Sequence, residues 1–375
     1  MSNARRRRLL PTLSALLLSA LGASPSFAAA SIEAGAALYA KYCQLCHGAQ
    51  LEGYAADNAT SLSSPTFRAS ASTAFLQAAI ERGRAGTSMA GYGKAVGGPL
   101  EPAEVDALIA FIRGGANAPA ALPPKASKGN VATGARVYAT YCQTCHGTLE
   151  QRGDAVHLAN PMFLATASDA YIRVAIAAGR PGTTMEAWQK KLAAAEIEDV
   201  IAYMRSLARP VPLAPVIAAS PVASGPAAIV MNPKGHAPDF TLRLGRYASV
   251  ADVAKAYDEK RRFVLIDARP TSDYLRMHIP GAISVPYFDM HDLDKVPNDG
   301  TWVVTYCVCP HEESGHVLEE LRTRGYANTA VLDEGFFVWK ERGHPVEAAA
   351  GQLPIAAPPT KPTPSVPAPL PSPRP

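Results

Sequence analysis

One seven-residue stretch occurs twice and restricts the fold of this chain more than any other feature. Residues 42–48 read YCQLCHG and residues 141–147 read YCQTCHG. Each copy offers two thiols about one helical turn apart, with a His directly after the second. Zinc and a redox-active dithiol are the ordinary alternatives for Cys-x-x-Cys. A zinc site needs further ligands at a suitable spacing, and a dithiol does not need the His.

Cys-x-x-Cys-His is the attachment sequence for c-type haem. The two thiols add to vinyl groups on one edge of the porphyrin, and the His meets the iron as the proximal ligand. The residues in these roles are Cys43, Cys46 and His47 in the first copy, and Cys142, Cys145 and His146 in the second. The sequence therefore predicts two covalently bound haem c groups.

The repeat extends well beyond the motif. The loop at 83–89 (GRAGTSM) matches the loop at 179–185 (GRPGTTM). Apolar residues at helical spacing precede each motif and close each copy, which predicts helices there. These segments are 33–39 and 105–113 in the first copy, and 133–138 and 197–205 in the second.

The matched loops identify candidates for the sixth iron ligand. Met89 and Met185 occupy the same loop position, so we expect both to bind iron through sulfur. Met162 and Met204 align with other residue types and are interpreted as packing residues. His157 has no counterpart in the first copy, and we expect it at the surface. Iron held by His and Met has no open coordination position and transfers one electron.

Both copies resemble class I cytochrome c, which has an N-terminal helix, a haem motif, a Met loop and a C-terminal helix. The resemblance implies two all-α domains, at 31–117 and 129–208, and a function in electron transfer. An Ala/Pro linker at 118–128 joins them. The implied partners are redox proteins: a donor dehydrogenase, and an acceptor cytochrome or oxidase.

The beginning of the chain has the pattern of a secretory signal peptide, which we place at 1–30. Arg5–Arg8 precede an apolar run at Leu9–Leu21, and small residues follow. The run is short for a membrane span of about 20 residues, and an uncleaved anchor is the alternative. Export and haem c attachment together indicate a periplasmic protein. Without those four of its 36 basic residues the chain has 32 against 32 acidic ones, so no basic excess favours nucleic acid.

The C-terminal part changes character. A Pro/Ala-rich linker at 209–235 precedes a region at 236–348, and a Pro-rich tail at 349–375 is expected to be disordered. Short apolar runs indicate buried strands, and they alternate with helical patterns, so we expect an α/β domain with a parallel sheet. The expected strands are 263–266, 302–306 and 330–332, and the expected helices are 251–260 and 314–324.

This region resembles the rhodanese family over about 100 residues. The matching pieces are Asp-Ala-Arg at 267–269, Tyr-x-x-x-His-Ile-Pro-Gly-Ala-Ile at 274–283, Val-Val-Thr-Tyr-Cys at 303–307, Gly335 and Trp339. The resemblance implies that Cys307 carries sulfane sulfur as a persulfide, taken from a sulfane donor. We interpret Asp267, Arg269 and His278 as structural.

The loop at 307–314 departs from the family pattern. It reads CVCPHEES, is one residue longer than the common form, and has Glu312 near the place of the usual arginine. A carboxylate there disfavours a thiolate, unless the glutamates face solvent in the first helical turn, and His311 could compensate. Cys309 could resolve a persulfide on Cys307 or form a labile disulfide with it. The alternative is that both thiols are inert and the region only docks a partner.

Overall fold

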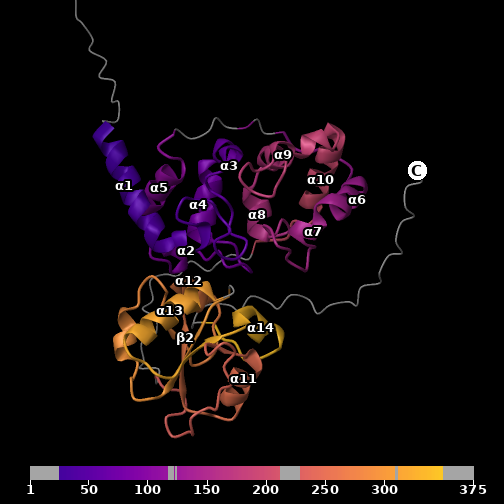
Figure 1. Cartoon of the computed structure of the whole chain (residues 1–375). Helices are drawn as coiled ribbons and strands as arrows, with labels where there is room; N and C mark the ends of the chain where they lie inside the picture. Colours follow the sequence, from indigo (N-terminus) through magenta and orange to yellow (C-terminus); the bar gives the residue numbers. More distant parts are fainter. Residues whose placement is uncertain (1–24, 117–121, 123–124, 212–228, 309–310, 349–375) are drawn as a thin grey trace, which may run out of the picture.

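The computed structural model describes residues 25–116, 122, 125–211, 229–308 and 311–348 (Figure 1). Most of the predicted signal peptide, the Pro-rich tail and Cys309 lie outside these residues. Among the described residues, no helix combines the length and the apolar character needed to cross a membrane.

The predicted repeat is present in the fold as two sets of helices in the same order. The first repeat contains α1 (Pro25–Tyr42), α2 (Gln44–His47), α3 (Pro65–Ser70), α4 (Thr73–Arg82), the 3-10 helix η1 (Lys94–Val96) and α5 (Pro102–Ile112). The second contains α6 (Val131–Tyr141), α7 (Gln143–His146), α8 (Pro161–Thr166), α9 (Asp169–Ala178), the 3-10 helix η2 (Trp188–Lys190) and α10 (Ala194–Ser206). The prediction of helical repeats is therefore confirmed.

In each repeat the first and last helices pack at a glycine. A Cβ at Gly35 would lie 2.1 Å from the carbonyl oxygen of Ala107 on α5. At Gly134 it would lie 1.9 Å from the carbonyl oxygen of Asp199 on α10. Neither space admits a larger residue, so the close approach of α1 to α5, and of α6 to α10, requires glycine at both positions.

The two repeats pack against each other through one shared hydrophobic core. Helix α3 contacts α9 and helix α4 contacts α8, which are reciprocal pairs in the repeat. At the centre, the rings of Phe75 and Tyr171 have centroids 4.7 Å apart. The contact is therefore close to two-fold symmetric, and Figure 1 shows the two sets of helices side by side.

The C-terminal region is a five-stranded parallel sheet in the order β1-β5-β4-β2-β3, which confirms the predicted α/β class. The strands are β1 (Tyr247–Ala248), β2 (Phe263–Asp267), β3 (Ile283–Ser284), β4 (Trp302–Tyr306) and β5 (Thr329–Leu332). The helices are α11 (Val250–Asp258), α12 (Thr271–Arg276), the 3-10 helix η3 (His291–Lys295), α13 (Glu312–Thr323) and α14 (Gly335–Glu341).

Alternate residues of the central strands enter two separate cores. Phe263 and Leu265 pack in the core that contains residues of α11 and α14. Val264 and Ile266 pack in the core that contains residues of α13. Helices thus cover both faces of the sheet, as a buried parallel sheet requires.

The C-terminal region lies against the first repeat, where α13 contacts α2 (Figure 1). Leu45 of α2 packs against the sheet core on the α13 side, and Phe288 packs against the cores of both regions. The helix that carries the first Cys-x-x-Cys-His motif is therefore part of an interface within the chain.

Candidate haem and sulfur sites

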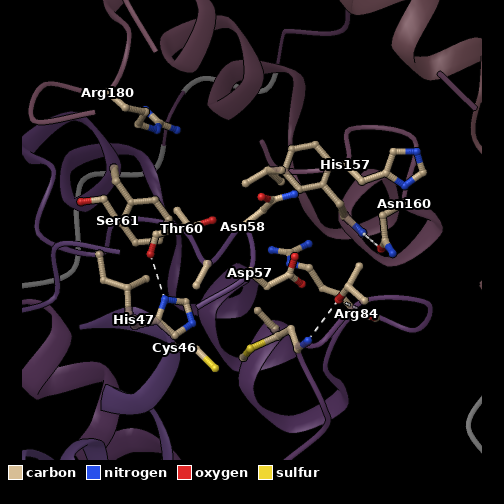
Figure 2. A pocket seen from close by; sticks show the side chains of 18 of the residues that line it. Cys46, His47, Asp57, Asn58, Thr60, Ser61, Arg84, His157, Asn160 and Arg180 are labelled. Atoms are coloured by element: carbon tan, nitrogen blue, oxygen red, sulfur yellow. Dashed lines mark hydrogen bonds between the residues drawn. The ribbon is translucent and has the colours of Figure 1, made fainter. Parts of the chain in front are cut away.

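One continuous cavity lies between the two repeats (Figure 2). Its empty volume is about 1790 Å³, including the part open to solvent. The four predicted iron ligands, His47, Met89, His146 and Met185, all line this cavity.

The two motif histidines are held in the same way. His47 Nδ1 lies 2.8 Å from the carbonyl oxygen of Thr60, and His146 Nδ1 lies 2.7 Å from that of Val156. A carbonyl oxygen only accepts, so Nδ1 donates its proton and Nε2 keeps a lone pair for a metal. Burial lowers the pKa of both imidazoles, which favours the neutral form that binds iron.

The two methionine loops have the same hydrogen bonds. The Met89 amide donates to Thr87 Oγ1, and its carbonyl accepts from the Arg84 amide at 2.7 Å. In the second loop, Met185 is bonded in the same way to its neighbours Thr183 and Arg180. The matched sequence therefore folds into matched geometry at the position predicted for the sixth ligand.

Two buried nitrogen atoms, one on each of two arginines, show whether the residues that line the cavity suit a haem group. Arg84 Nη1 and Arg180 Nη2 are buried and have no hydrogen-bond partner within the described part of the chain. Both residues line the cavity, and burial lowers the pKa of Arg84 to about 10. A buried guanidinium calls for an anion, and haem carries two propionate carboxylates. The residues present therefore fit one such group in each repeat.

The side chains of Arg84 and Arg180 also contact aromatic rings of the opposite repeat. The Arg84 guanidinium lies 5.2 Å from the ring centroids of both Phe75 and Phe163. The Arg180 guanidinium lies 5.0 Å from the ring of Tyr171 and 5.9 Å from that of Phe67. Each guanidinium thus contacts one ring of its own repeat and one of the other. Sequence reasoning missed both residues, although the matched Gly-Arg-x-Gly-Thr-x-Met loops contained the signal.

A salt bridge near Met89 also joins the repeats. Asp57 accepts hydrogen bonds from Arg152 at 2.8 Å and from Ser88 at 2.6 Å. Burial opposes ionisation of Asp57, but these hydrogen bonds outweigh it and lower the pKa of the carboxyl.

His157 also lines the cavity. It is half-buried, and its Nε2 lies 2.8 Å from the carbonyl oxygen of Thr148. His157 thus keeps part of the expected surface exposure and also lines the cavity.

The expected sulfur residue lies at the carboxyl end of a central strand. Cys307 follows β4, is 1% exposed, and has Sγ 3.2 Å from Ser314 Oγ on α13. The N-terminus of this 12-residue helix favours a thiolate or persulfide anion at Cys307.

The two glutamates of α13 have different environments. Glu312 is exposed, as expected for a residue facing solvent. Glu313 is 2% exposed and its Oε2 has no hydrogen-bond partner among the described residues. Of the two alternatives left open for these glutamates, a solvent-facing position therefore holds for Glu312 but not for Glu313, because one residue turns the helix by about 100°. Burial raises the pKa of Glu313 well above its usual value, so ionisation of this carboxyl beside Cys307 is disfavoured.

His311 of this loop, and the three residues interpreted as structural, each have their own hydrogen-bond partners. His311 Nε2 lies 2.5 Å from the carbonyl oxygen of Asp333 and 3.1 Å from its carboxylate. Arg269 forms a buried pair with Asp267, at 2.8 Å and 2.5 Å, and donates to the Met277 carbonyl. His278 Nδ1 lies 2.8 Å from the carbonyl oxygen of Tyr274, and the two rings stack. The geometry agrees with the structural interpretation of Asp267, Arg269 and His278.

The interface with the first repeat uses residues outside the matched rhodanese motifs. Tyr287 Oη donates to the Tyr42 carbonyl at 2.6 Å and lies 3.2 Å from Tyr92 Oη. The Phe288 ring meets the Tyr42 ring edge-on, with centroids 4.8 Å apart. The contact is buried and specific, and it places the C-terminal region directly over the first haem motif.

Comparison with known proteins agrees with this arrangement. A family model described as cytochrome c oxidase, cbb3-type, subunit III matches residues 30–112 and again 129–204. A model described as a rhodanese-like domain matches residues 249–342. The chain is therefore a tandem pair of cytochrome c domains followed by a rhodanese-like domain. A cytochrome c domain of this kind implies haem c and redox partners.

Individual relatives match only parts of the chain. An uncharacterised protein of Synechocystis sp. is 29% identical over 82 residues, which are 22% of this chain and 45% of that protein, so the chain spans about half the length of this relative. A rhodanese-like domain from Anabaena sp. is 20% identical, over 32% of this chain and 92% of its own, with a TM-score of 0.27.

Two further solved structures are similar to different parts of the chain. Thiosulfate sulfurtransferase from Pseudomonas aeruginosa is 25% identical, over 28% of this chain and 21% of its own, with a TM-score of 0.26. A reducing HAO-like protein complex of Kuenenia stuttgartiensis is 17% identical, over 47% of this chain and 96% of its own, with a TM-score of 0.32.

Proposed function

We propose that this protein is an exported, periplasmic electron carrier with two covalently bound haem c groups, whose rhodanese-like domain binds or transfers sulfane sulfur on Cys307. The observation that carries the electron-transfer part is the duplicated cradle: in each repeat, a carbonyl-bonded His, a matched Met loop and an arginine with one buried nitrogen that has no hydrogen-bond partner among the described residues. Arg5–Arg8 and the apolar run after them support export.

Each group of residues has a distinct task in this proposal. The motif cysteines attach the haem edge, the histidines and methionines bind the iron, and Arg84 and Arg180 neutralise buried carboxylates. When bound, the haem supplies one-electron exchange with no open iron position for substrate. The protein holds the ligands and excludes water. The proposed partners are a donor dehydrogenase and an acceptor cytochrome or oxidase.

The sulfur step is a balanced displacement. The Cys307 thiolate attacks the outer sulfur of thiosulfate, the S–S bond of the donor breaks, and sulfite leaves with the electron pair. Cyanide then takes the outer sulfur as thiocyanate and restores the thiolate. The N-terminus of α13 favours the anion in both steps, and the raised pKa of Glu313 opposes a second buried negative charge.

The test uses the full-length protein and two measurements. Intact mass and a haem assay should give two attached haems per chain, and both should be reduced and reoxidised reversibly. Thiocyanate release from thiosulfate and cyanide should occur in the wild type and be lost in Cys307→Ser. A haem-to-protein ratio of one would refute the dihaem proposal, and equal thiocyanate release in the two proteins would refute the role of Cys307.

A pure electron carrier, with the rhodanese-like domain as a docking module, is the second candidate. The burial of Cys307 and the buried contact of Tyr287 with Tyr42 favour it, because both fit a structural role. The two candidates differ when oxidised haems meet a sulfane donor. Haem reduction that requires Cys307 favours sulfur chemistry, and wild-type reduction in both Cys307→Ser and Cys309→Ser favours the pure carrier.

A further inference from the structure

We propose that the surface formed by Tyr141 and Trp188 on the second cytochrome domain is the docking site for a separate small electron-transfer protein. The rhodanese-like domain fills the corresponding surface of the first domain. This inference rests on the proposed electron-transfer function and adds the place and the kind of partner.

The covered surface belongs to the first domain. It consists of Tyr42, which precedes Cys43, and Tyr92, which lies three residues after Met89. The ring centroids of Tyr42 and Tyr92 are 6.0 Å apart. Phe288 packs on both rings, at 4.8 Å and 6.2 Å, and Tyr287 donates its hydroxyl to the Tyr42 carbonyl. The contact therefore combines aromatic packing with one hydrogen bond to a backbone carbonyl.

The second domain repeats this surface. Tyr141 holds the motif position of Tyr42, and Trp188 lies three residues after Met185, where the first domain has Tyr92. The centroids of Tyr141 and Trp188 are 5.6 Å apart at an interplanar angle of 54°, close to the 60° of the first pair. The same aromatic pair thus stands beside the haem motif in both domains.

The two copies differ in exposure. Tyr42 is 9% exposed, whereas Tyr141 is 49% exposed and is among the exposed large apolar residues of the described part of the chain. Cys46 is half-buried and Cys145 is exposed. Trp188 is half-buried, and Lys191 Nζ lies 5.1 Å from its ring centroid. Exposed aromatic surface beside an exposed cofactor-attachment motif is the kind of surface that marks an interaction site.

One substitution between the copies indicates the type of complex. Leu45 packs into the core of the rhodanese-like domain, and its equivalent is the exposed Thr144. A smaller and more polar surface suits a partner that binds and leaves, since transient redox contacts are small and less apolar than permanent ones. The partner is therefore a protein with an aromatic or aliphatic patch over its redox centre and a hydroxyl or amide donor for the Tyr141 carbonyl.

The experiment uses azurin, a small blue-copper protein, as the probe for the full-length protein. Zinc-substituted azurin allows binding to be measured without electron transfer, by hydroxyl-radical footprinting and by titration. Oxidised azurin gives the second-order rate constant for its reduction by the reduced protein. We expect protection of Tyr141 and Trp188 in the complex.

Three variants decide the outcome. Trp188→Ala should weaken azurin binding and slow the rate at least tenfold, Trp188→Tyr should retain most of both, and the matched surface control Val131→Ser should change neither by more than twofold. The inference would be overturned if Trp188→Ala bound and reduced azurin as well as the wild type does. It would also be overturned if azurin protected other surfaces, if the protection came from self-association, or if the wild type did not bind azurin. Haems that cannot be reversibly reduced and reoxidised would refute the proposed function. Binding of zinc azurin tests the docking site independently of that result.

Discussion

Removing the Tyr287 hydroxyl tests whether the rhodanese-like domain is held on the first cytochrome domain. In Tyr287→Phe the ring remains, but the buried Tyr42 carbonyl and Tyr92 hydroxyl lose their partner. A buried polar group left without a partner costs about 1–3 kcal/mol. Because these bonds cross the interface, the docking equilibrium should shift by about 5- to 150-fold toward the undocked state.

Hydrogen exchange followed by mass spectrometry measures this shift. Amides of α2 and of residues 285–293 should exchange faster by that factor, since local opening governs their exchange. Tyr326→Phe is the matched control, because the Tyr326 hydroxyl is also buried and donates to the Val296 carbonyl at 2.7 Å, within the rhodanese-like domain. The control should weaken that domain without speeding exchange in α2. Equal exchange of α2 amides in Tyr287→Phe and wild type would refute the interface argument.

Three further predictions concern the sites. Replacing Cys43 and Cys46 together with Ala should remove one covalent haem and leave the other, as measured by intact mass. Met185→His should lower the potential of one haem, since Met raises it relative to His, and should remove the weak sulfur-to-iron absorption band; an unchanged potential would contradict Met ligation. Glu313→Gln should change how stability depends on pH. The pKa of Glu313 is raised in the folded state. The contribution of this carboxyl to the free energy of unfolding is therefore complete below about pH 4.5, and it is lost as the pH rises, by up to about 1.4 kcal/mol per pH unit. Thermal unfolding should therefore show the Gln variant gaining on the wild type above pH 4.5, and parallel curves would contradict the burial of this carboxyl.

The sequence alone predicted those features whose chemistry or hydrophobic pattern lies within a short stretch of the chain. The haem motif needs two thiols and a His within five residues, so its spacing alone predicts the cofactor. Helices α5 and α10 are long enough to show a helical apolar period, and strands β2 and β4 are short, mostly apolar runs of the kind found in buried strands. The duplication added an internal comparison, which singled out Met89 and Met185 among the methionines. Their ligation remains a prediction, although the structure places both in the shared cavity.

The remaining features depend on contacts between distant segments. Strands β1 and β3 have two residues each, too few to show a period. The side of α13 that Glu313 occupies depends on how the helix packs against the sheet and against α2. The guanidinium of Arg84 finds the ring of Phe163 only after the two repeats pack together. None of these positions follows from local propensity, because each is determined by the tertiary neighbours.

The interface gives different roles to the two halves of a duplication. Identical motif chemistry at 42–48 and 141–147 predicts equivalent haem sites, yet within the described residues the rhodanese-like domain covers only the first. The sulfur residue Cys307 lies in the domain that covers the first site, and the exposed Tyr141 lies at the second. If both proposals hold, the first haem site lies beside the sulfur domain, the second lies beside the external partner, and the core crossed by Arg84 and Arg180 lies between them. A protein lacking the second haem should then pass no electrons to azurin through the Tyr141 surface.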